Sequence, residues 1–178
     1  MPYPPQGLIA TGGEAAGDWE VIAEVEPTSD VDYVEFTGLD INSDKAYVIF
    51  MTYKNPLSVA INNKMYVNDD LTDADYYSQR ISANGTSVGA SQDNAPYIGG
   101  ANASSSSTMV IFVMLDPNGY MRASVIQNVL TGTDLYVILR VVVSNNTFAN
   151  ITKIRIQASE SGGIGAGSKF VLARVKRP

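Results

Sequence analysis

The chain has 178 residues, of which 45% are hydrophobic and 17% are charged, a balance that suits a single globular domain. It contains no cysteine and no histidine, which excludes disulfides, thiol nucleophiles, a histidine general base and the commonest transition-metal ligand. With 12 basic and 18 acidic residues the net charge is -6, so we expect no nucleic-acid surface, and no apolar run is long enough to span a membrane.

Residues 1–17 are rich in Pro, Gly and Ala and show no hydrophobic period. They predict an extended N-terminal arm that precedes one folded domain over residues 18–178. The opening residues Met1–Gly7 lack a basic start followed by an apolar run, so we expect no secretory signal there.

The first half of the domain has the period of β-strands. Residues 19–25 alternate, residues 31–37 are rich in β-formers, and residues 46–53 are apolar on both faces, which predicts a central buried strand. Residues 57–61 and 64–67 predict a hairpin that turns at Asn62 and Asn63.

A polar stretch follows over residues 68–107, too long for an idle loop. We expect one or two short edge strands and exposed loops within it. Because it is too polar to line a dry subunit interface, we also expect it to face outward from an assembly.

Strand character returns over residues 108–115, 120–129, 135–143, 151–158 and 169–176. Residues 162–167 carry four glycines, but no helix follows them, so they predict a hairpin turn rather than a phosphate loop. Nine to eleven short strands predict an all-β fold, specifically an antiparallel β-sandwich of jelly-roll type.

Ten tyrosines are the strongest signal for binding. Tyr76, Tyr77 and Tyr97 lie in the polar stretch, where tyrosine among Asn, Ser and Gly is typical of sugar or protein recognition. These three are the candidate ligand-binding residues, and a carbohydrate-binding module or adhesin is the alternative function. Tyrosines that merely pack at sheet edges would give the same pattern.

Asp69, Asp70, Asp73 and Asp75 form the densest carboxylate group. Calcium takes several such oxygens, so they are the candidate metal ligands, although the spacing lacks the glycine and distal glutamate of a calcium loop. A solvated loop that keeps a sheet edge from pairing explains them equally. We otherwise expect no cofactor and no catalytic residue, and a glycosidase that uses these carboxylates is the least favoured reading.

An ordered set of short motifs resembles structural proteins of tailed phages and related viruses. The set comprises Trp19–Ile22, Phe36–Asp40, Tyr47–Tyr53, Met65–Asn68, Asp75–Gln79, Ile151–Ile156 and Gly167–Leu172. Members of that group usually end in Leu-Tyr-Gly, where this chain has Leu172-Ala173-Arg174.

The resemblance implies a jelly roll displayed at the virion surface, as a head decoration, a collar or a tail fibre. It implies a homo-oligomer, commonly a trimer, that contacts other virion proteins and attaches to the host, with a host-surface glycan as one conceivable target. It transfers no catalytic residue.

Overall fold

The computed structural model describes residues 19–84, 86–131 and 134–175, so the N-terminal arm expected over residues 1–17 lies outside the described residues. The described residues form twelve strands, one α-helix and one 3-10 helix. In chain order these are β1 Trp19–Val25, β2 Tyr33–Thr37, α1 Ile41–Asp44, β3 Tyr47–Lys54, β4 Ile61–Val67, η1 Asp73–Asp75, β5 Tyr76–Asn84, β6 Ser87–Asp93, β7 Tyr97–Ala101, β8 Ser106–Leu115, β9 Tyr120–Thr131, β10 Asp134–Thr147, β11 Lys153–Ala158 and β12 Lys169–Val175.

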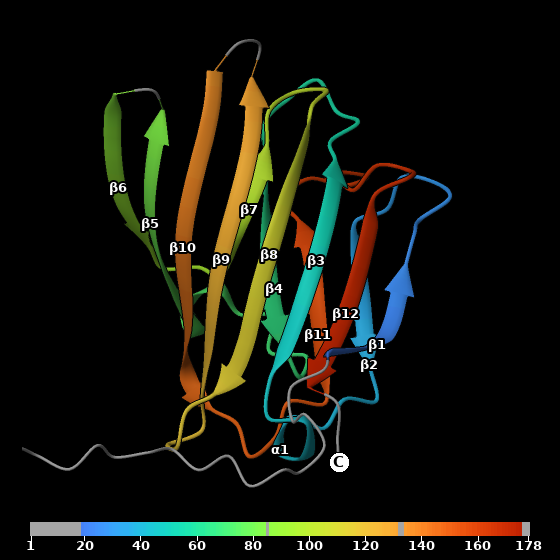
Figure 1. The fold of residues 1–178 in the computed structure, drawn as a ribbon, viewed down its shortest axis with the longest axis vertical. Coiled ribbons are helices and arrows are strands. Elements are labelled where there is room, and N and C mark those ends of the chain that lie inside the picture. The colour runs from blue at the N-terminus through green and yellow to red at the C-terminus, as the bar shows by residue number, and fades with distance from the viewer. Residues whose placement is uncertain (1–18, 85, 132–133, 176–178) are drawn as a thin grey trace, which may run out of the picture.

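Two antiparallel sheets face each other, which confirms the predicted all-β sandwich (Figure 1). The larger sheet has the order β1-β12-β3-β8-β9-β10-β5-β6, and the smaller has the order β2-β11-β4-β7. Without the β5–β6 and β9–β10 pairs, two sheets of four strands remain, in an order that is compatible with a jelly roll.

The four additional strands widen only one of the two layers. They continue the large sheet beyond β8, whereas the small sheet ends at β7 (Figure 1). The part of the large sheet formed by β10, β5 and β6 therefore extends past the small sheet, and we call it the wing.

The core lies between the sheets and follows from the alternation of side chains along each strand. In β8, Met109, Ile111 and Val113 point inward and are buried, and in β11, Ile154 and Ile156 do the same. The strand predicted over residues 151–158 is present as β11, with Ile154, Ile156 and Ala158 on its buried face.

Three local predictions are wrong. Asn62 and Asn63 lie inside the continuous strand β4 rather than at a hairpin turn, because Ile61, Asn63 and Met65 alternate into the core. The polar stretch over residues 68–107 forms three complete strands, β5, β6 and β7, and the start of β8. Residues 162–167 do not close a hairpin, because β11 and β12 belong to different sheets and the glycine-rich segment crosses between them.

Candidate functional site

The outward face of the large sheet is apolar over most of its width, and this is the most unusual surface of the described molecule. In β10, Leu135, Val137, Leu139 and Val141 alternate with inward residues and are 40–57% exposed. Between β3 and β6, the other exposed large apolar side chains on this face are Phe50, Tyr77, Ile81, Val88, Phe112, Met114 and Ile126. We call these eleven residues the apolar face.

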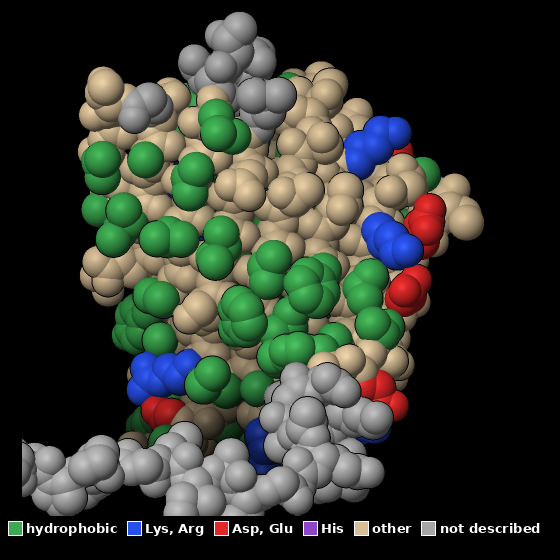
Figure 2. Space-filling view, in the orientation of Figure 1, with side chains coloured by type: hydrophobic (Ala, Val, Ile, Leu, Met, Phe, Trp, Pro, Cys, Tyr) green, Lys and Arg blue, Asp and Glu red, His purple; other side chains and the backbone are tan. Residues whose placement is uncertain are grey.

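The strand register brings these side chains together in rows. One row crosses six strands from β3 to β6, with each member directly opposite the next: Phe50, Val110, Ile126, Leu139, Ile81 and Ala90. Figure 2 shows this face with hydrophobic side chains across it and the charged side chains of that view at its margins. Cross-strand neighbours of this kind form one continuous surface.

This surface corrects one expectation from the sequence. Residues 46–53 were predicted to be buried on both faces, but Phe50, on the outward side of β3, is 48% exposed, since no second layer among the described residues covers it. A strand whose residues are apolar on both faces is normally packed against another layer on each face.

The three candidate tyrosines do not form one site. Tyr76 is fully buried, and its hydroxyl donates to the carbonyl of Asp70 at 3.0 Å, so its ring supports the core. Tyr77 is 42% exposed on the apolar face. Tyr97, at the start of β7, lies between two cations, with Lys64 Nζ 5.4 Å and the Arg140 guanidinium carbon 5.9 Å from its ring centre.

The four candidate aspartates point to different partners. Asp69 pairs with Lys153 at 2.5 Å, and Asp73 accepts from Lys64 and from the Tyr66 hydroxyl, each at 2.6 Å. Asp70 accepts from Asn146, and Asp75 ends η1. Among the residues that the structure describes, no three acidic side chains gather as ligands of one metal ion.

The pKa of Asp73 shows how firmly it is held. Burial alone would raise the pKa of Asp73, but the hydrogen bonds from Lys64 and Tyr66 outweigh burial and lower this pKa from its ordinary value of 3.8. Asp73 is thus an ionised structural group rather than a proton donor.

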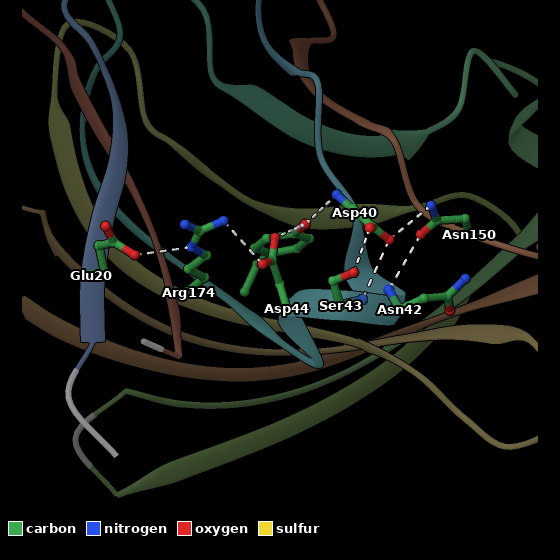
Figure 3. A network of polar contacts seen from close by, with 8 residues as sticks. Glu20, Asp40, Asn42, Ser43, Asp44, Asn150 and Arg174 are labelled. Carbon is green, nitrogen blue, oxygen red and sulfur yellow. Dashed lines mark hydrogen bonds and ion pairs between the residues drawn. The ribbon is translucent and has the colours of Figure 1, made fainter. Parts of the chain in front are cut away.

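Away from the candidate aspartates, a further network of polar contacts lies at the end of the sandwich near α1 (Figure 3). Arg174 bridges Glu20 and Asp44 at 3.1 Å each, and the Tyr47 hydroxyl donates to Asp44 Oδ2 at 2.7 Å. Burial, with the hydrogen bond to Asp44, raises the pKa of Tyr47 above its usual range, so the phenol keeps its proton. The network links β1, β12, α1 and β3, and we assign it to stability.

Sequence reasoning missed two arginines on the inward side of the wing, Arg80 in β5 and Arg140 in β10. A usable signal was present for Arg140, which is the single charged residue in the apolar run 135–143. Arg80 lies in the polar stretch over residues 68–107, where one more charged residue is not a distinguishing signal.

Within the described part of the chain, no helix has the length and apolar character to cross a bilayer. No protein-family model matches the chain, and a search of curated proteins finds no match.

Proposed function

We propose that this chain is a virion structural protein, a β-sandwich that assembles through its apolar face and is displayed at the particle surface as a head decoration, collar or tail-fibre component. The observation that supports assembly is the apolar face itself. The virion setting rests on the ordered motifs described above.

The size of the apolar face favours a subunit interface. From the exposed fractions of its eleven side chains, it offers roughly 1,000 Å² of apolar area, against about 300–600 Å² for the largest patch of a typical monomer. A standard protein interface buries about 800 Å² on each partner, so this face is large enough for a stable contact.

The proposed occupant is further copies of the same chain, in a closed homotrimer. Closed symmetry covers the apolar face of every subunit, whereas an open arrangement would leave one face uncovered at each end. The edge strand β6, which carries Ser87, Ser91, Gln92 and Asp93 besides Val88, then lies at the rim of the assembly, where other virion proteins or the host surface can be met.

The first test is the oligomeric state in solution, measured by light scattering after size exclusion. We expect three times the 19.1 kDa mass of one chain. Leu139→Glu places a charge at the centre of the apolar face, opposite Ile126 and Ile81, and should give monomers. Val59→Glu is the matched control, because Val59 is 52% exposed and Leu139 is 50% exposed, but Val59 lies outside the apolar face.

A stable wild-type monomer, or a Leu139→Glu variant that keeps the wild-type mass, would refute the assembly proposal. The virion setting is tested separately, by electron microscopy of native particles labelled with an antibody against the chain. Particles that never carry the label would refute that part.

A further inference from the structure

A cavity of about 270 Å³ lies where the small sheet ends and the wing begins. Its walls come from both layers, with Gly99 and Gly100 of β7 on one side and Arg80, Tyr136 and Arg140 of the wing on the other. The two glycines let β7 approach its neighbours closely, since a Cβ added at Gly99 would lie 2.5 Å from Gln127 Oε1 and one at Gly100 would lie 2.1 Å from the carbonyl oxygen of Ile61.

The cavity holds two cationic side chains that directly face each other across strands. Arg80 in β5 and Arg140 in β10 are register partners, and both point inward. Like charges in directly opposite positions destabilise a sheet. Arg140 is only 5% exposed, so its charge is also removed from solvent.

The described residues neutralise the charges of Arg80 and Arg140 only in part. The ion pair of Arg140 is with Asp93, at 3.8 Å, well beyond the ~2.8 Å of a charge-assisted hydrogen bond. The Nε atoms of Arg80 and Arg140 are buried and have no hydrogen-bond partner. Burial, and then the charge of Arg80, lower the pKa of Arg140, although an arginine keeps its proton in proteins.

Gln127, which also lines the cavity, carries an acceptor without a donor. Gln127 is fully buried, its Nε2 donates to the carbonyl of Gly100, and its Oε1 has no partner. A buried polar atom without a partner costs about 1–3 kcal/mol. Because Gln127 Oε1 is itself shut off from solvent, a ligand in the cavity meets the guanidinium groups of the two arginines, and it must therefore bring a negative group.

We propose that this cavity binds an acidic monosaccharide unit, with its carboxylate on the guanidinium groups of Arg80 and Arg140. Guanidinium groups bind planar carboxylates through two parallel hydrogen bonds. The volume exceeds the needs of a simple oxyanion, and Tyr136, which lines the cavity, provides an aromatic side chain for contact with the sugar ring. None of the three tyrosines singled out in the sequence is among the residues that line the cavity.

The experiment is isothermal titration calorimetry of the full chain with glucuronate and with N-acetylneuraminate. Glucose tests the need for the charge, and acetate and inorganic phosphate test the need for the sugar. We expect saturable binding of at least one acidic sugar, no heat from glucose, and at least tenfold weaker binding of acetate and phosphate.

Two variants and one control locate the binding. Arg140→Met and Arg80→Gln should each weaken binding of the acidic sugar at least tenfold. Arg155→Gln removes the same charge from a site paired with Glu35, at 2.6 Å, and should leave the affinity unchanged. If Arg140→Met fails to fold, Arg80→Gln decides the question, because Arg80 is only partly buried.

Three results would overturn the proposal: no saturable binding of either acidic sugar, phosphate bound as tightly as the sugar, or an equal loss in Arg155→Gln. None of them depends on the oligomeric state, so the cavity and the apolar face can fail separately.

Discussion

Removing the hydroxyl of Tyr47 tests whether the network near α1 stabilises the fold. Tyr47 is fully buried in β3, and its hydroxyl makes two hydrogen bonds. It donates to Asp44 Oδ2 at 2.7 Å and accepts the backbone N–H of Asp40 at 2.8 Å. Tyr47→Phe deletes both bonds and keeps the ring, so the loss reports on polar contacts rather than on packing.

The magnitude follows from the two groups that lose this partner. A buried polar group deprived of its hydrogen bond costs about 1–3 kcal/mol, and more when it is charged. Asp44 keeps Arg174 at 3.1 Å, which limits the loss on that side. We therefore expect Tyr47→Phe to lower the free energy of unfolding by about 3 kcal/mol, or the Tm by roughly 6–12 °C for a chain of this length.

Urea and thermal unfolding followed by circular dichroism measure this loss, at one fixed protein concentration because assembly would raise the apparent stability. Tyr53→Phe is the matched control. Tyr53 is equally buried, but its hydroxyl donates to one neutral acceptor, the carbonyl of Gly163 at 2.7 Å, so about 1 kcal/mol is expected. A loss in Tyr47→Phe no larger than in Tyr53→Phe would refute the reasoning.

Two further predictions concern stability. Because the pKa of Asp73 is lowered in the folded state, its ionised form stabilises the fold above the ordinary value of 3.8, and this contribution is lost as the pH falls through the lowered value. Asp73→Asn should thus be less stable than wild type at pH 7, and the difference should shrink below about pH 4 in urea titrations; a difference that does not change with pH contradicts this. Gly100→Ala should destabilise strongly, since its Cβ would lie 2.1 Å from the carbonyl oxygen of Ile61 in the paired strand β4, and an unchanged Tm would exclude that close approach.

The strands that the sequence predicts well are those with a simple burial pattern. Residues 108–115 and 135–143 fall within β8 and β10, since an apolar run bounded by turn residues has few alternatives to a strand. Between them, β8 and β9 join as an antiparallel pair through Asp116–Gly119, where Asp, Pro, Asn and Gly are typical turn residues.

Two of the errors share a physical cause, which is that packing outweighs local turn propensity. Asn62 and Asn63 favour a turn when considered alone. In the molecule, Ile61 and Met65 bury their side chains and hold the strand straight through the asparagines. The glycines at 162–167 likewise mark a change of direction, but not which sheet the chain enters next.

The cavity could not be predicted, because it depends on register. Arg80 and Arg140 are 60 positions apart in the sequence, and only the pairing of β5 with β10 places them opposite each other. The apolar face depends in the same way on which side of each strand is left without a second layer.

Leu139 and Arg140 allow the two proposals to be tested against each other, because they are neighbours in β10 and alternate residues of a strand point to opposite faces. Leu139→Glu should abolish the oligomer and leave acidic-sugar binding intact, since Leu139 is on the outward side. Arg140→Met should keep the oligomer and lose sugar binding. Without ligand it should also match or exceed the thermal stability of wild type, because an apolar side chain replaces a buried charge with an incomplete partner. If both substitutions removed both properties, one disrupted fold would explain the results and neither surface could be assigned a function.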